Sequence, residues 1–435
     1  MNHFSKFCIS AALILCSGVL RAGEVASIRQ PETVPPGKTL TMTDGINLAL
    51  ANQSAIRQSA AQLEIQKGQV TQSASKLLPG TSVSSSTQVA DSDETNITQL
   101  STSASQLIYD FGRSPAGLTG ARRQEDASRE ALAGTTSDVI LTVKQAYFNL
   151  LQTNHLVEVF AEQLKAQDEH VAEAQARKDA GVAPLADVLK AQAAAASAKV
   201  DLVTARRNAD LARVALNSAM GVNIRSTLSI EETTEPAPPS LEEDLLVSTA
   251  LRQRPEVRQS AYLVEANQAA VKVARTDNLP SVTTRVNRNQ AFGSGLNGSP
   301  NSWDWTLNLS WSPYDSGFTK GAVRSAKAQV VSSQEALYDV TQRVTQDVVQ
   351  SRLNILAAEE QLTSALAEVA SAEENLSVSS GRYEAGVGIL LDVLDAQAAF
   401  LKAKVDELSA RYGLSTARAV LKHAIGATAV EGVGK

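Results

Sequence analysis

The stretch Ala385–Arg411, AGVGILLDVLDAQAAFLKAKVDELSAR, decides how this chain is organised, because the same pattern occurs a second time. Ala180–Arg206 reads AGVAPLADVLKAQAAAASAKVDLVTAR, and each matching residue lies 205 positions earlier. Each copy opens with small residues around a glycine and continues as a run rich in Ala, Leu and Val. The spacing exceeds the period of about 20–50 residues that solenoid proteins use. The chain therefore contains two fused copies of one substructure.

This duplication divides the chain into two similar halves with short additions. We predict a signal peptide over 1–22, an extended arm over 23–40, repeat 1 over 41–220, a linker over 221–240, repeat 2 over 241–427 and a short tail over 428–435. The signal is indicated by an apolar run from Phe7 to Leu20 behind a basic start, with cleavage expected after Ala22. That run is too short to span a bilayer.

Cysteine content and charge narrow the class of protein further. Cys8 and Cys16 both lie in the predicted signal, so a mature chain would have neither a disulfide nor a thiolate metal site. A lipid anchor on Cys16 would need a small residue before it, where Leu15 stands. The formal net charge is −6, and the signal's two charged residues, Lys6 and Arg21, are both basic. The acidic balance disfavours nucleic acid as a partner.

Each repeat is predicted to fold as helix, strand, strand, long helix, turn and helix. In repeat 1 we expect a helix over 43–78, strands over 81–90 and 97–109, a long helix over 115–179, and a turn over 180–184. In repeat 2 the strands are expected over 281–290 and 303–312, and the turn near 384–389. Two strands cannot bury a face on their own, so the strands of each half must be part of a larger sheet.

The long helices carry apolar residues at every seventh position, which predicts left-handed coiled-coil packing. The two seams match at an offset of 205 residues and comprise Val143, Leu150, Val157, Leu164 and Val171, and Val348, Ile355, Leu362, Val369 and Leu376.

One strand indicates the environment of the sheet. The segment 303–311 reads WDWTLNLSW and contains all three tryptophans of the chain. Apolar and polar residues alternate along it, so one face carries Trp303, Trp305, Leu307, Leu309 and Trp311. Its length suits a transmembrane β-strand, and Trp at both ends matches interfacial aromatic girdles. A strand of a soluble sheet with a buried Trp face is the alternative. The other strands fit less well, because Arg285 and Arg288 interrupt one of them.

With the duplication, the AGV…DVLxAQ stretches and the segment Tyr383–Asp395, the chain resembles the TolC-type outer membrane efflux protein family over about residues 40–427. The resemblance implies a mixed α/β membrane protein, mainly α. Three copies would each give four strands to one 12-stranded transmembrane β-barrel, above a long α-helical coiled-coil barrel in the periplasm. It implies a passive exit duct of a tripartite efflux or type I secretion system in the Gram-negative outer membrane, surrounded by its lipid. Its partners would be a periplasmic adaptor and an inner-membrane pump that selects the cargo.

The resemblance also implies functional roles for particular residues. The turns Ala180, Gly181, Val182 and Ala385, Gly386, Val387 would dock on the adaptor. Asp392 and Asp395 would ring the periplasmic entrance as a cation-favouring constriction. Tyr383 and Asp187 match gate contacts of the family. Gly388 and Ala186 stand where the family has an arginine and a threonine, so the gate is either looser or held by another pair, with Arg382 or Lys190 as candidate cations.

Two other classes of protein are alternatives to the export duct. A soluble periplasmic coiled-coil adaptor or scaffold would explain the heptads but not the Trp strand. A secreted enzyme would need a catalytic motif, and no nucleophile elbow, phosphate loop or zinc-helix motif is present. His155, His170 and His423 have no ligand spacing, and we expect His155 and His170 to be solvated helix positions. We therefore predict no enzyme activity, cofactor or metal site.

Overall fold

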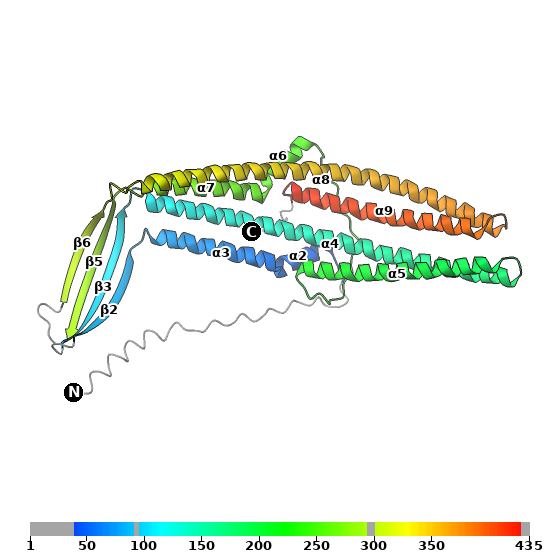
Figure 1. The fold of residues 1–435 in the computed structure, drawn as a ribbon, viewed down its shortest axis with the longest axis horizontal. Helices are drawn as coiled ribbons and strands as arrows, with labels where there is room; N and C mark the ends of the chain where they lie inside the picture. Colours follow the sequence, from blue (N-terminus) through cyan, green and yellow to red (C-terminus); the bar gives the residue numbers. More distant parts are fainter. Residues whose placement is uncertain (1–38, 91–94, 294–300, 428–435) are drawn as a thin grey trace, which may run out of the picture.

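The computed structural model describes residues 39–90, 95–293 and 301–427 as one elongated molecule (Figure 1). A small β-sheet lies at one end, and two helical hairpins turn at the opposite end. The predicted signal peptide over 1–22, most of the arm over 23–40 and the tail over 428–435 lie outside the described residues.

Each repeat follows the predicted order of elements, with one additional helix. The end of the arm forms β1 (Thr39–Leu40). Repeat 1 contains α2 (Met42–Asn52), α3 (Ser54–Ser75), β2 (Gly80–Ala90), β3 (Thr95–Tyr109), α4 (Arg113–Asp179) and α5 (Leu185–Met220). Repeat 2, with the linker strand β4 (Ser229–Ile230), contains α6 (Glu243–Gln253), α7 (Pro255–Arg275), β5 (Ser281–Gly293), β6 (Asn301–Ser310), α8 (Phe318–Glu384) and α9 (Leu390–Ala424).

The four longer strands form one antiparallel sheet in the order β2-β3-β5-β6. The pairing of β3 with β5 joins the two repeats, as the requirement for a larger sheet predicted. Strand β6 ends at Ser310, so Trp311 lies just after it rather than within it. The indole N–H of Trp311 donates to the carbonyl oxygen of Asn278 at 3.1 Å, which ties this end of the sheet to the segment before β5.

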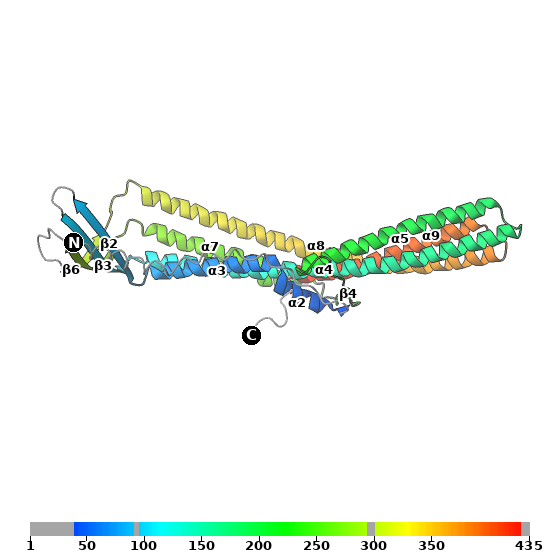
Figure 2. The ribbon, with the colours of Figure 1, turned by 90° about the horizontal axis from the view of Figure 1, so that it is seen from below.

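The long helices pack as two hairpins, α4 along α5 and α8 along α9, and α4 also packs against α9 (Figures 1 and 2). The predicted seams supply much of the core, since Val143, Val348 and Ile355 are fully buried. Small residues such as Ala174 and Ala403 are also fully buried and let neighbouring helices approach closely. Across the described ranges, no helix combines the length and apolar character needed to cross a membrane.

The helix expected over 43–78 is broken into α2 and α3. Gln53 adopts an extended conformation between them, with ψ at 128°, and its side-chain amide donates to the carbonyl oxygen of Ala219 at 3.1 Å. Gly221 follows α5 with a positive φ of 68°, and a Cβ there would come within 2.9 Å of the Asn52 backbone. The close approach of α5 to this break explains both the interruption and the glycine. Arg254 and Gly426 repeat the arrangement in the second half.

The acidic segment expected to be a linker over 221–240 is firmly attached to the helices. Its strand β4 pairs in parallel with β1. The buried Glu235 forms ion pairs with Lys144 of α4 at 3.0 Å and Lys422 of α9 at 2.7 Å. The hydroxyl of Tyr147 donates to the carbonyl oxygen of Leu40. The segment therefore clamps the middle of the helical bundle instead of acting as a free connection.

Candidate functional site at the hairpin tips

Both hairpins turn through a glycine in the left-handed conformation, Gly181 with φ at 77° and Gly386 with φ at 73°. In each turn, the amide after the glycine donates to a carbonyl five residues earlier, which satisfies the helix end. These bonds run from Val182 to Arg177 and from Val387 to Arg382, each 3.0 Å long. The six predicted docking residues occupy these two turns, namely Ala180, Gly181, Val182, Ala385, Gly386 and Val387.

The tips present apolar side chains to solvent. Val182 is 76% exposed and Val387 is 71% exposed, and Leu185 and Ile389 beside them are also exposed. Beneath this surface, an apolar cluster holds the four helices together, with Ala174, Val188, Ala191, Tyr383, Leu390 and Val393 buried in it. An apolar surface on a rigid base suits docking to another protein.

Tyr383 is the largest side chain of this cluster and is only 7% exposed. The guanidinium of Arg177 lies over its ring, 4.2 Å from the centroid, and an Arg177 N–H donates to the Tyr383 carbonyl oxygen at 3.4 Å. Glu173 forms an ion pair with Arg177 at 2.7 Å, which holds the guanidinium over the ring. Burial raises the pKa of the Tyr383 hydroxyl, against a lowering by Arg177. Tyr383 therefore stays neutral and acts as an anchored ring.

Tyr383 and Asp187, the two residues that match gate contacts, interact only through the charge of Asp187 in this protomer. Among the described residues, no hydrogen bond joins them, and the charge of Asp187 contributes only a small increase to the pKa of Tyr383. Gly388 packs tightly, since a Cβ there would lie 3.0 Å from the Tyr383 amide nitrogen. Neither Arg382 nor Lys190, the cations considered from the sequence, packs on the tyrosine. Arg177 does so instead.

Asp392 and Asp395 begin α9 on one exposed face, three residues apart. Asp392 lies in the first turn, where a carboxylate interacts favourably with the helix dipole. Neither carboxylate forms an ion pair with another described residue, so both charges remain available at the tip.

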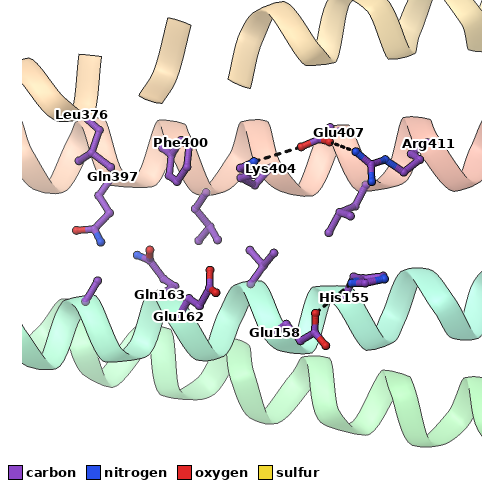
Figure 3. Close-up of a pocket in the computed structure, with 14 residues that line it drawn as sticks. His155, Glu158, Glu162, Gln163, Leu376, Gln397, Phe400, Lys404, Glu407 and Arg411 are labelled. Carbon is purple, nitrogen blue, oxygen red and sulfur yellow. Dashed lines mark hydrogen bonds and ion pairs between the residues drawn. The ribbon is translucent and has the colours of Figure 1, made fainter. Parts of the chain in front are cut away.

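A cavity of about 530 Å³ lies farther from the tip, between α4 and α9 (Figure 3). Most of its charged groups are paired: Glu407 pairs with Arg411 at 2.6 Å and with Lys404 at 3.4 Å. His155 pairs with Glu158 at 3.1 Å. In the part of the chain that the structure describes, no group of His, Cys, Asp and Glu could hold a metal ion.

The histidines are helix positions with partners rather than freely solvated side chains. His155 contacts Glu158 and also Glu232 at 3.0 Å. Burial lowers the pKa of His155, but these two hydrogen bonds outweigh it and raise the pKa overall. His170 contacts Gln397 at 2.9 Å. Each histidine ties α4 to a neighbouring segment, which is a structural role.

The family model described as "Outer membrane efflux protein" matches residues 45–222 and 246–427, one segment in each repeat. The chain belongs to the outer membrane efflux protein family. Protein CyaE of Bordetella pertussis is 25% identical over 380 residues, 84% of this chain and 79% of that protein. Outer membrane protein TolC of Vibrio cholerae is 24% identical over 392 residues, 87% and 89% of the two chains. The fold is similar to the CmeC outer membrane channel of Campylobacter jejuni, with a TM-score of 0.77, 20% identity and coverage of 88% and 85%.

Family membership confirms several predictions at once. The outer membrane efflux protein is a channel of the Gram-negative outer membrane and not an enzyme, and its helices extend into the periplasm. The alternative of a soluble coiled-coil adaptor is overturned, because both repeats match the channel family and the chain has the channel fold. The predicted roles of the tip residues stay predictions.

The main residue of the efflux protein's tip that sequence reasoning missed is Arg177. The sequence indicates Arg382 as a candidate gate cation, and Arg177 is the equivalent residue 205 positions earlier. This offset between the repeats is the signal that could have indicated Arg177 as well. The offset alone could not decide between the two arginines, because only the packing of α4 against the neighbouring hairpin brings one of them to Tyr383.

Proposed function

We propose that this outer membrane efflux protein is a trimeric, passive exit duct that docks by its hairpin tips on a periplasmic adaptor of an inner-membrane pump. The observation that carries the proposal is the open four-stranded sheet joined to two long helical hairpins. Within the described residues, β2 pairs only with β3 and β6 only with β5. An edge of this length needs a partner, and three copies would close a 12-stranded barrel without edges.

The distribution of side chains supports a transmembrane position for that barrel. Trp303, Trp305, Leu307 and Leu309 share one exposed face of β6, and Asp304 lies on the other. On the polar face, the side-chain amide of Asn287 donates to Asp304 at 2.8 Å. One face is therefore suited to lipid and the other to a water-filled lumen. β6 is 10 residues long, which suits a tilted transmembrane strand.

The exposed acidic and apolar residues of the tips suit an acidic periplasmic entrance that docks on an adaptor. Each protomer would bring Asp392 and Asp395 to the threefold axis, and three copies would form two rings of like charge that favour cations. The exposed apolar residues Val182 and Val387 are suited to an adaptor surface. Tyr383, locked under Arg177, would hold the two hairpins of one protomer together at the closed tip.

The test is the oligomeric state of the detergent-purified mature protein together with its conductance in a planar bilayer. We expect a trimer with small, cation-selective conductance, as a constricted tip requires. A detergent-free soluble monomer without conductance would contradict the proposal. A trimer with a large, unselective conductance would retain the duct and remove the closed, acidic entrance.

A further inference from the structure

Two arginines of β5, Arg285 and Arg288, lie on opposite faces of the sheet. They are three residues apart, and successive side chains of a strand alternate between faces. Arg285 is paired in register with Thr306, on the polar face of β6. Arg288 is paired with Trp303, on the apolar face. Both side chains are exposed. One arginine therefore belongs to the lumen, where charge is ordinary, and the other to the surface that we assign to lipid.

On this outward face, Arg288 is the first charged residue along β5 and β6, counted from the end of the sheet next to the helices. Moving from the helices toward the hairpin loops, the register pairs β5 residues Val282, Thr284 and Val286 with β6 residues Leu309, Leu307 and Trp305. The next pair on the same face is Arg288 with Trp303. A charged side chain is costly at the bilayer midplane and cheap near an interface. The position of this first charged residue, beside Trp303, therefore indicates the membrane interface.

This interface is the one at the cell surface. The helices extend into the periplasm, and the end of β5 and the start of β6 lie at the opposite end of the sheet (Figure 1). Arg288 lies in the half of β5 nearer to that end, paired with Trp303. Trp303 is two residues from the start of β6 and is 76% exposed. A tryptophan ring at headgroup level is typical of such a girdle.

Three residues with hydrogen-bond donors lie side by side at this level of the sheet, on adjacent strands. The register places Thr102 of β3 beside Arg288 of β5, and Arg288 beside Trp303 of β6. Neighbouring strands are about 5 Å apart, so all three side chains can reach one small group. Within the described ranges, the guanidinium of Arg288 has no ion-pair partner. An arginine, an indole N–H and a hydroxyl without a carboxylate beside them suit an anion, and a guanidinium matches a phosphate bidentately.

We propose that Arg288, Trp303 and Thr102 form a binding site for the phosphate group of a lipid in the outer leaflet. The bound lipid lies against the apolar band with its acyl chains along Val286 and Trp305, and its headgroup phosphate meets Arg288. This site fastens the barrel at a fixed depth in the membrane. The inference rests on the proposed orientation of the sheet, with its Trp face toward lipid.

The test uses the detergent-purified mature oligomer titrated with diphosphoryl lipid A, with binding followed by native mass spectrometry. Loss of one charge-assisted hydrogen-bond pair weakens binding by about tenfold or more. We expect that loss for Arg288→Gln, and for wild-type protein titrated with dephosphorylated lipid A. Arg285→Gln is the matched control, because it removes the same charge from the same strand on the opposite face, and we expect its binding to equal that of the wild type.

Equal binding by Arg288→Gln and wild type would overturn the site, and so would an equal loss in Arg285→Gln. Displacement of lipid A by millimolar inorganic phosphate alone would show a free-anion site and overturn the assignment to lipid. If Arg288→Gln does not assemble, Trp303→Phe keeps an aromatic ring at this position but removes the indole N–H, and it must weaken binding in the same direction. Failure of the duct proposal itself is distinguished by the absence of any detergent-stable trimer in the wild type.

Discussion

The guanidinium of Arg177 lies 4.2 Å from the centre of the Tyr383 ring, and this contact joins the two repeats at the tip of the molecule. Arg177 belongs to the last turns of α4 and Tyr383 to the end of α8. The repeat equivalent of Arg177 is Arg382, which is exposed. Duplication therefore supplied the same side chain twice, and only one copy forms the contact that fastens the two hairpins.

Replacing Arg177 by Gln should loosen the tip. A cation over an aromatic ring contributes about 0.5–1 kcal/mol when exposed and ~2 kcal/mol when desolvated, so the ratio of open to closed tips should rise by roughly fivefold. Single-channel recording in a planar bilayer measures this as longer or larger openings. Arg382→Gln is the matched control and should leave gating unchanged. Identical gating of Arg177→Gln and wild type would refute the role of the contact.

Removing the tip charges by Asp392→Ala with Asp395→Ala should reduce cation selectivity. Rings of carboxylates concentrate cations at a constriction, so their loss should also weaken block by multivalent cations. Reversal potentials in a salt gradient measure the change. Asp179→Ala removes an exposed carboxylate at the end of α4 instead and serves as the control. Unchanged selectivity in the double variant would dismiss the proposed entrance rings.

A carboxylate on the outward face of β6 should impair insertion of the barrel. Trp305→Asp replaces an exposed aromatic ring within the apolar band, where a charge is costly in lipid. We expect a several-fold lower yield of heat-resistant oligomers in outer membranes, measured by electrophoresis without boiling. Thr306→Asp places the same charge one residue along on the opposite face and should assemble normally. Equal yields for both variants would count against the lipid-facing assignment.

Neutralising Glu235 should destabilise the middle of the helical bundle. Burial raises the pKa of this carboxyl, but hydrogen bonds from Lys422 and Lys144 outweigh burial and lower the pKa overall. Removing one partner of a buried ion pair costs about 3–5 kcal/mol, and we expect the low end for Glu235→Gln because the two lysines are partly exposed. Thermal denaturation measures the loss, with the exposed Glu231→Gln as control.

The ion pairs of Glu235 with Lys144 and Lys422 also predict that the stability of the fold depends on pH. An acid with a lowered pKa stabilises the folded state above its ordinary value of 4.5 and loses that contribution as the pH falls below it. The stability difference between wild type and Glu235→Gln should therefore be full at pH 7 and shrink on acidification below about 4.5. A difference that stays constant down to pH 3 would assign the effect to packing alone.

Much of the fold was predictable because its signals are local. The alternation in β6 and the heptads of α4 and α8 are visible within a few residues, and the four strands and both tip turns were expected close to their observed ranges. The break at Gln53 was missed, since no glycine or proline marks it and only the contact with α5 interrupts the helix. The break at Arg254 had a signal, because the residue before a proline avoids helical conformation.

The candidate site at the hairpin tips was likewise predictable only in part. The glycine turns and the exposed aspartates follow from sequence, whereas the choice of Arg177 as the partner of Tyr383 does not. The buried Glu235 also gave no local signal, since its lysines lie 91 and 187 residues away in the chain.

The sequence by itself determined that this protein is duplicated, that its long helices form coiled coils, and that one strand has a face suited to lipid. These properties depend on the period of side chains along a helix or strand, which acts between near neighbours. Only the tertiary structure decided which arginine covers Tyr383, that the acidic linker clamps two hairpins, and that Arg288 lies between Thr102 and Trp303 in the sheet. Those relationships depend on the register of strands and the packing of helices that are distant in sequence, which local periodicity does not specify.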